Sequence, residues 1–228
     1  MAPVVVMAAV VAPELIWISM PGAYGGFTFL AFCRPVCIVT AMARQTDTRD
    51  RTLRTAVDLF RARGYHGTGM NQVISEGKLP KGSLYFHFPD GKEQLAAEAV
   101  ELAAAEVCGW VDVAFSQTPD PAAALSVITE TLAAGLVDSD YQLGCPIGTL
   151  AHDAGDTERV REACAAAFSS WHAVISGHLA RHGLSEPDSL ATAVLAALEG
   201  AQLVARSQRD VAPLRAVATM LAPLLKGA

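Results

Sequence analysis

The sequence predicts an all-α fold, with an N-terminal three-helix helix-turn-helix domain and a larger C-terminal helical domain. From residue 47 onward, apolar residues recur mostly at the spacing of a helix that buries one face. Glycine and proline separate these segments, and no segment alternates apolar and polar residues as a half-buried strand would. With 228 residues, 52% of them apolar, the chain is long enough to bury a substantial core.

The first 41 residues differ from the rest because they are nearly uncharged and rich in valine, alanine and phenylalanine. Leu15 to Cys33 is long enough to span a membrane, but Pro21-Gly22 and Gly25-Gly26 interrupt it. A secretory signal would need a basic start, which is missing here. We therefore predict that residues 1–41 are an apolar extension outside the functional fold, that this fold begins at Met42, and that the protein has no membrane partner.

The charges divide the chain into a basic and an acidic part. Residues 42–93 hold nine Lys or Arg against six Asp or Glu, whereas residues 94–228 hold seven against sixteen. The net charge of -6 conceals this division. A basic segment ahead of an acidic one indicates two different roles within one chain.

The first two helices of the basic segment are predicted from their apolar stripes and their ends. A helix from Asp47 onward carries a buried stripe at the i, i+3, i+4, i+7 spacing and ends at Gly64; the stripe is Leu53, Ala56, Val57 and Phe60. Thr68-Gly69 is expected to cap a second, short helix that ends at Gly77.

A third short helix follows almost at once, within the stretch "LPKGSLYFHF". Pro80 suits the first turn of a helix because its missing N–H has no partner there, and Leu84 and Phe88 fall on one side at i, i+4. Two short helices joined by a tight turn and preceded by a longer helix make a helix-turn-helix unit. The sequence therefore predicts that residues 42–90 bind DNA.

The third helix is predicted to enter the major groove by its N-terminal end. Lys81 is suited to a phosphate or a guanine edge, and Gly82 lets DNA approach the backbone closely. Ser83, Tyr85 and His87 offer hydrogen bonds without added charge. Arg44, in the polar arm, is a candidate for a phosphate or the minor groove, although a solvated leader is the alternative.

The acidic part is predicted to be helical throughout. Asp90-Gly91-Lys92-Glu93 has the pattern of a capping box before a long helix that runs to about Phe115. Further helices are expected near residues 121–136, 147–153, 156–182, 187–208 and 211–225, separated by proline and glycine. Residues 91–228 are thus assigned to a second domain.

The stretch from Arg51 to Val100 resembles the N-terminal DNA-binding domain of TetR-family transcriptional regulators. The residues that carry the resemblance are Phe60, Gly64-Tyr65, Lys81-Gly82-Ser83-Leu84-Tyr85, His87-Phe88 and Lys92-Glu93. "GCPIGTLAHDA", Gly144 to Ala154, is similar to the LmrA/YxaF-like subgroup. The resemblance implies an all-α homodimer in the cytoplasm whose C-terminal domain binds a small-molecule effector and releases a pseudo-palindromic DNA operator, with no cofactor and no catalytic step.

Two positions depart from the family pattern. The family usually has glycine in the turn where this chain has Lys78, so we expect Lys78 to adopt a positive φ at a cost of about 1 kcal/mol. Lys92 lies one residue further from the aromatic residue than is usual, and the resemblance implies that it contacts phosphate. The complete predicted DNA-contacting set is Arg44, Thr68, Lys81, Gly82, Ser83, Tyr85, His87 and Lys92.

The alternative from another functional class is a redox or nucleophilic enzyme or sensor that uses Cys145. This cysteine precedes Pro146 at a predicted helix N-terminus, where a thiolate would be stabilised. No resolving cysteine lies near it in sequence, and the five cysteines have no paired spacing. His172, His178 and His182 lack a further ligand at metal-binding spacing, so surface or core roles are the better interpretation.

The C-terminal domain is predicted to hold an effector among its aromatic residues and to form a dimer through its last two helices. In those helices small residues alternate with large apolar ones, which allows close packing against a second copy. Burial within the monomer is the alternative for part of this surface. The predicted ligand-binding set is Trp110, Phe115, Cys145, Phe168 and Trp171, and the predicted interface is Val194, Leu195, Leu198 and Ala201.

Overall fold

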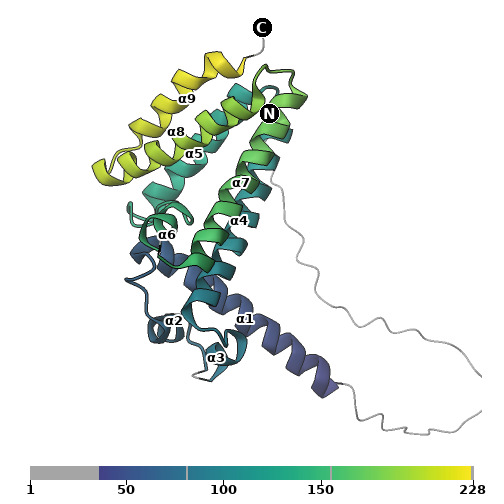
Figure 1. Ribbon diagram of the computed structural model, residues 1–228, viewed down its shortest axis with the longest axis vertical. Helices are drawn as coiled ribbons and strands as arrows, with labels where there is room; N and C mark the ends of the chain where they lie inside the picture. Colours follow the sequence, from purple (N-terminus) through teal and green to yellow (C-terminus); the bar gives the residue numbers. More distant parts are fainter. Residues whose placement is uncertain (1–35, 81, 155, 227–228) are drawn as a thin grey trace, which may run out of the picture.

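The computed structural model describes residues 36–80, 82–154 and 156–226, with side chains from residue 48 onward. Every regular element in this part of the chain is an α-helix, which confirms the all-α prediction. Figure 1 shows α1, α2 and α3 at one end, and α4 and α7 side by side, leading to α5, α8 and α9 at the other. The helices are α1 (Val36–Arg63), α2 (Met70–Glu76), α3 (Ser83–His87), α4 (Lys92–Gln117), α5 (Pro121–Asp138), α6 (Gly148–Asp153), α7 (Glu158–Arg181), α8 (Pro187–Gln208) and α9 (Ala212–Leu225).

Helix α1 ends where the sequence predicts and begins earlier. Gly64 has φ +72°, a left-handed conformation that glycine adopts without strain, and this ends the helix. The start is at Val36 rather than at Asp47, since no glycine or proline occurs between Val36 and Arg63. Residues 1–35 lie outside the described residues, so a functional start at Met42 stays a prediction.

The turn between α2 and α3 contains the strained residue that the sequence predicts. Lys78 has φ +49°, which confirms the expected positive value. The N–H of Lys78 donates to Ser75 O at 3.2 Å, and the N–H of Leu79 donates to Ile74 O at 2.9 Å. These two bonds form a Schellman motif, which normally places glycine where Lys78 stands.

One predicted cap is confirmed in part and another is wrong. Of the predicted pair Thr68-Gly69, Gly69 caps α2, while the Thr68 hydroxyl turns inward and donates to Leu59 O at 3.2 Å and Gly64 O at 2.8 Å. Gly91, not Asp90, caps α4, because the chain needs a positive φ of +75° there and glycine supplies it most cheaply. The Asp90 N–H donates instead to Gln94 Oε1 at 3.0 Å.

Helix α3 begins at Ser83, so Pro80 precedes the helix instead of lying in its first turn. Pro80 still contributes, because its carbonyl accepts the N–H of Ser83 at 2.9 Å. Leu84 and Phe88 are both fully buried, as their spacing predicts, and they anchor the short helix to the core. A helix this short depends on such packing rather than on its own propensity.

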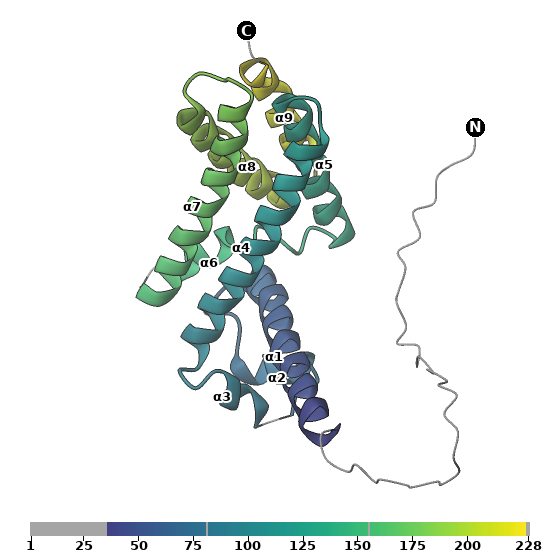
Figure 2. The same cartoon turned by 90° about the vertical axis from the view of Figure 1, so that its right-hand side faces the viewer.

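The C-terminal helices agree with the predicted ranges to within a few residues. Pro121 starts α5 and Pro187 starts α8, each in the first turn where proline is tolerated. Helix α4 packs against α1 near its start and against α7 and α5 further along, so it belongs to both ends of the molecule. Figure 2 shows this continuity from the side.

The predicted dimer-interface residues lie mainly on the inner face of α8. Val194, Leu198 and Ala201 are buried within the monomer, and Leu195 is half-buried against the core. Leu203 and Val204 are exposed instead. The predicted interface stays a prediction, and the exposed face of α8 is a second candidate, because this helix carries apolar residues on both sides and the sequence pattern does not distinguish them.

Helices α5 and α8 are long and apolar enough to cross a membrane by length and composition. Both bury residues in the hydrophobic clusters of the bundle, and a core helix of a soluble protein passes the same test.

Candidate nucleic-acid interface and apolar cavity

Helix α3 presents its polar and aromatic side chains outward. Tyr85 is 55% exposed and Phe86 is 67% exposed, whereas Leu84 and Phe88 on either side pack inward and are buried. Gly82 immediately precedes the helix, and a Cβ atom placed on it would meet nothing within 4 Å. Ser83 and His87 are half-buried, and the His87 ring packs edge-on against Phe86 at 5.2 Å. Of the predicted contact residues on this helix, Tyr85 is thus the one whose side chain is most fully exposed.

Sequence reasoning missed part of this surface. Phe86 was not predicted to contact DNA, although a large apolar residue at an exposed helical position is itself a signal. A groove next to α3 is lined by both Tyr85 and residues of α2 and the turn after it. Among the latter, Asn71, Ser75 and Lys78 are exposed, so the second helix adds polar groups beside the third.

Other predicted DNA-contacting residues are placed differently. Thr68 is 1% exposed and its hydroxyl is used inside the domain, so its side chain does not reach the surface. Lys92 is half-buried with its Nζ 4.3 Å from the centre of the Tyr65 ring, and burial lowers the pKa of Lys92 while Asp153 opposes that change. Lys81 lies outside the described residues, as does the side chain of Arg44.

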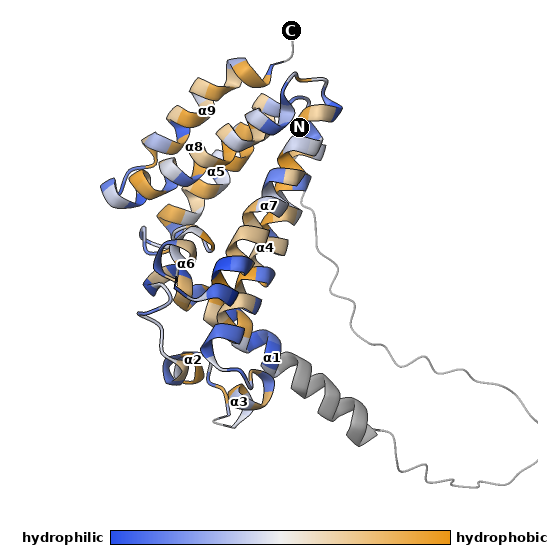
Figure 3. Ribbon diagram, viewed as in Figure 1, coloured by the Kyte–Doolittle hydropathy of each residue, from blue (hydrophilic) through white to orange (hydrophobic). Residues whose placement is uncertain are grey.

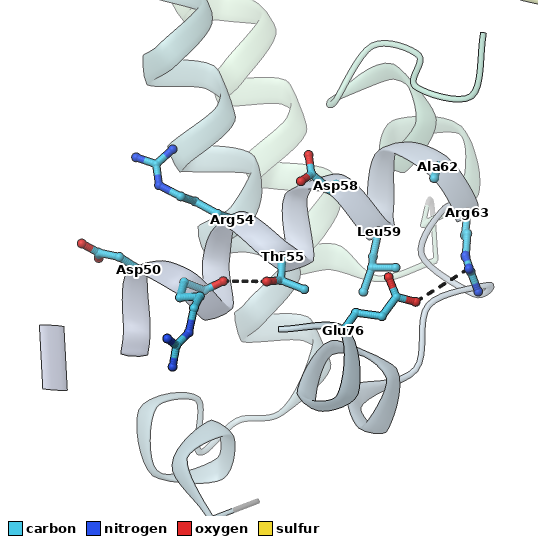
Figure 4. A pocket seen from close by; sticks show the side chains of 9 residues that line it. Asp50, Arg54, Thr55, Asp58, Leu59, Ala62, Arg63 and Glu76 are labelled. Carbon is cyan, nitrogen blue, oxygen red and sulfur yellow. Dashed lines mark hydrogen bonds and ion pairs between the residues drawn. The ribbon is translucent and has the colours of Figure 1, made fainter. Parts of the chain in front are cut away.

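A wide hollow of about 700 Å³ lies between α1 and α2. Figure 4 shows that its lining carries both signs of charge, from Asp50, Arg54 and Asp58 on α1 and from Glu76 on α2. Arg63 lies 3.7 Å from Glu76, and this pair is exposed. A wide, exposed hollow lined by charged side chains of both signs is a poor site for an apolar effector.

A smaller, apolar cavity of about 50 Å³ lies among α4, α5, α7 and α8. Trp110 from α4 and Trp171 from α7 line it, together with Cys145 and Pro146 from the segment before α6. Three of the five predicted ligand-binding residues therefore meet here. We call this space the apolar cavity; its lining is Val107, Trp110, Val111, Ile128, Leu132, Cys145, Pro146, Trp171, Ile175, Leu195, Leu198, Glu199 and Gln202.

The other two predicted ligand-binding residues lie outside this lining. Phe115 is buried further along α4, where its ring stacks on His178 at 4.8 Å. Phe168 packs edge-on against Trp171 at 5.5 Å, so it supports the cavity wall from behind. The indole N–H of Trp171 donates to Ala104 O at 3.1 Å, which fixes the ring between α4 and α7.

The Cys145 thiol is not activated. Burial raises the pKa of Cys145 well above its ordinary value, and the nearby Glu199 carboxylate raises it further. The Gly148 N–H donates to its Sγ at 3.2 Å, but this does not outweigh the burial. The expected thiolate stabilisation at a helix N-terminus is therefore wrong, because the cysteine faces the interior and a carboxylate instead of solvent.

His172 and His178 each have one polar partner in the protein. His178 Nε2 lies 2.7 Å from Asp112 Oδ1, and His172 Nε2 lies 3.0 Å from Asp188 O. Within the described residues there is no cluster of three metal-ligating side chains.

The segment that includes α6 contacts the helix-turn-helix domain directly. Asp153, the last residue of α6, accepts the backbone N–H of His66 at 2.7 Å. A Cβ on Gly64 would lie 2.6 Å from the same carboxylate, so glycine is needed there for this approach as well as for its positive φ. The Arg61 side chain donates to Gly144 O at 3.1 Å. Sequence reasoning missed Asp153 because nothing in its local pattern indicates a partner 87 residues away.

Comparisons with known proteins agree with this arrangement. Residues 53–99 match the family "Bacterial regulatory proteins, tetR family", and residues 121–220 match "Transcriptional regulator LmrA/YxaF-like, C-terminal domain". The chain is 36% identical over 183 residues to the HTH-type transcriptional regulator LmrA of Bacillus subtilis, covering 79% of this chain and 97% of that protein. It is 33% identical over 188 residues to the uncharacterized HTH-type transcriptional regulator YxaF of the same organism, covering 81% and 98%.

A solved structure of the TetR-family regulator CifR, whose title describes a complex with a 26-base-pair operator DNA, has the same fold. It superposes with a TM-score of 0.67 at 22% identity, covering 77% of this chain and 95% of that chain. Identity to LmrA and YxaF spans nearly their whole lengths, and the two family matches cover the helix-turn-helix domain and most of the C-terminal helices. The chain therefore belongs to the TetR family of transcriptional regulators, with a C-terminal domain of the LmrA/YxaF-like type.

Proposed function

We propose that this regulator is a homodimeric repressor that a small apolar or aromatic effector releases from its operator. The observation that carries the proposal is the course of α4. Its start lies beside the helix-turn-helix domain, and Trp110, further along the same helix, lines the apolar cavity. A rigid helix that contacts both regions can pass a change in one to the other. The cytoplasm is the compartment in which such a regulator meets its DNA.

DNA reading is assigned to α3 and the turn before it. The exposed Tyr85 ring and the open backbone at Gly82 fit a helix whose N-terminal end enters the major groove. Lys78 adds positive charge in the turn before this end, and Lys81, two residues before Ser83 in sequence, is assigned to a phosphate or a guanine edge. Lys92 is assigned to phosphate, and its contact with Tyr65 holds the side chain close to the helix-turn-helix domain.

Dimerisation is assigned to the outward faces of α8 and α9. Leu203 and Val204 on α8 and Met220 and Leu224 on α9 are large apolar residues that the monomer leaves exposed. Figure 3 shows apolar stretches along both helices. A two-fold axis between these faces would form a four-helix interface and set the spacing between the two α3 helices.

Release is assigned to movement of the cavity walls. A cavity of about 50 Å³ is below the size of a typical ligand site, so a ring-bearing effector must displace α4, α7 or the Cys145-Pro146 segment. That segment leads into α6, whose Asp153 binds the backbone at the end of α1. Displacement at the cavity would thus reach the helix-turn-helix domain by two routes and change the separation of the two α3 helices.

The test is DNA binding by the full chain on its own upstream region, located by footprinting. Gly82→Leu should abolish operator binding, because the added side chain occupies the space that the groove would fill, while the fold is retained. The matched control is Gly109→Leu on α4, where a Cβ also meets nothing within 4 Å. If Gly82→Leu, folded by circular dichroism, binds operator as tightly as the parent, α3 does not enter the groove.

A further inference from the structure

A groove beside the apolar cavity is lined in part by the DNA-binding domain. Its volume is about 230 Å³. Residues of α1, α4 and α5 line it, together with the segment that precedes α6. We call this space the α1 groove; the residues of its lining that come from these three helices include Val57, Arg61, Ala103, Glu106, Thr131 and Leu132.

The α1 groove adjoins the apolar cavity. Val107, Trp110, Leu132 and Pro146 line both spaces. The cavity holds about 50 Å³, whereas ligand sites usually measure roughly 300 Å³ or more. A ligand that is larger than the cavity can therefore extend into the groove, and its far end would then lie against α1.

Arg61 supplies the positive charge of the α1 groove. Its Nε donates to Gly144 O at 3.1 Å, and within the described part of the chain its side chain has no other hydrogen bond or ion pair. No side-chain nitrogen of the described residues is both buried and without a partner. The two terminal nitrogens of Arg61 are therefore accessible to solvent, and a ligand can bind them without first breaking an ion pair.

The carboxylates nearby are placed so that an anion is favoured at the Arg61 end. Glu106 also lines the groove, but Arg54 Nη1 lies 2.9 Å from its Oε1 and forms an ion pair with it. Glu199 lines the apolar cavity and not the groove. A negatively charged group on a ligand is thus repelled at the cavity and attracted by the guanidinium.

We propose that the effector has an apolar or aromatic end and a carboxylate, and that Arg61 binds this carboxylate in the α1 groove. The inference rests on the proposed function, in which the apolar cavity is the effector site. The ring packs against Trp110 and Trp171, and the carboxylate accepts charge-assisted hydrogen bonds from the guanidinium. The carboxylate then competes with Gly144 O for Arg61, so the effector acts directly on the helix that supports the helix-turn-helix unit.

Three probes with the same ring and a similar chain separate the two ends of the ligand: 4-phenylbutyrate, 4-phenylbutyramide and 4-phenylbutylamine. A site that is only apolar would bind the neutral amide at least as tightly as the acid, because an ionised carboxylate costs more to remove from water. We expect the acid to bind the full-length protein about tenfold more tightly than either of the other two. Isothermal titration calorimetry measures all three affinities.

Substitutions at the two ends should have different effects. Arg61→Met keeps an unbranched side chain and removes the charge, so the affinity for the acid should fall to that for the amide, which stays unchanged. Arg61→Lys keeps the charge without the paired N–H groups and should retain part of the preference. Trp110→Leu removes a ring from the cavity wall and should weaken acid and amide alike. Circular dichroism checks the fold of each variant.

Arg63→Met is the matched control. Arg63 lies on the same helix and carries the same charge, but it is exposed, pairs with Glu76 at 3.7 Å and lines the charged hollow between α1 and α2. The preference for the acid should be unchanged in this variant. A loss as large as that in Arg61→Met would mean that the net charge of the protein attracts the acid, which overturns the contact with Arg61.

The outcomes distinguish this inference from the function on which it rests. Equal binding of acid and amide by the parent protein overturns recognition by Arg61, as does a preference for the acid that survives Arg61→Met. Failure of all three probes to bind, at concentrations up to their solubility, also overturns it. None of these results changes operator binding or its loss in Gly82→Leu, which test the DNA-binding function separately.

Discussion

Thr68 and Gln202 are buried to a similar degree, at 1% and 6% exposed, yet they lie in different surroundings. The Thr68 hydroxyl is shared between two carbonyls at the end of α1, whereas Gln202 lies where the apolar cavity meets two open grooves. In the helix-turn-helix domain, buried polar atoms hold the fold, and the groups suited to a ligand stand outside. In the C-terminal domain, the aromatic groups suited to a small ligand line the apolar cavity, and α8 and α9 expose large apolar residues such as Leu203 and Met220.

The largest difference is expected between two leucines on opposite faces of α8. Leu198→Glu places a carboxylate in the core and should lower the free energy of unfolding by about 3 kcal/mol or more. Leu203→Glu lies on the exposed face, so it should leave the monomer folded and split the dimer. Thermal unfolding and sedimentation measure the two effects; a folded monomer from Leu198→Glu together with a dimer from Leu203→Glu would reverse the assignment of faces.

A smaller loss is expected at Thr68. Thr68→Val removes the hydroxyl and leaves two buried carbonyls with one partner fewer each, which should lower the free energy of unfolding by about 2 kcal/mol. Thr131→Val is the control, because the Thr131 hydroxyl makes a similar bond to Val127 O on an exposed face. We expect that change to stay within about 0.5 kcal/mol. Equal losses in denaturant titrations would mean that burial does not decide the value of these bonds.

The ends of the helices were predictable from sequence where the local backbone conformation strongly favours one residue type. Gly64 and Lys78 take the positive φ values that the turn pattern implies, and Pro121 and Pro187 start their helices. The cap of α4 was not predictable in the same way. Asp90 and Gly91 are both good caps, and the path of the chain into α4, which the sequence does not reveal, decides for the glycine.

The candidate sites were predictable in kind and less so in detail. The exposed Tyr85 follows from the spacing of its buried neighbours, and Trp110 and Trp171 meet at the cavity because their helices pack together. The inner face of α8 and the contact between Asp153 and His66 depend on which helices become neighbours. Contacts between segments that are distant in sequence produce no pattern in the local spacing of apolar residues.

Asp153 provides a test of how the two regions are coupled. Asp153→Ala removes the acceptor for the His66 N–H and should lower stability by about 1 kcal/mol, because that N–H then returns to water. Operator affinity without effector should change little, whereas effector-induced release should weaken. Asp156→Ala is the control, since Asp156 lies 3.9 Å from the His66 ring in an exposed pair that contributes little. If the effector still releases the Asp153→Ala protein fully from its operator, the cavity and the helix-turn-helix domain are coupled through α4 and not through Asp153.

The smallest effect is expected at Lys78, and its sign is opposite to the others. Lys78→Gly relieves a left-handed conformation and should raise the free energy of unfolding by about 0.5–1 kcal/mol, net of the greater freedom of glycine in the unfolded chain. Ser75→Gly, within α2, should lower it by about 0.5 kcal/mol.

A strained lysine in a turn that glycine fits better suggests a use for its charge beside Tyr85. If that use is a phosphate contact, the stabilised Lys78→Gly protein should bind every DNA sequence more weakly, and the slope of log affinity against log salt should fall by about one. An unchanged slope would mean that the strain has no function in DNA binding. Titrations at several salt concentrations, on operator and scrambled duplexes, separate these outcomes, because a base contact would instead weaken the operator alone.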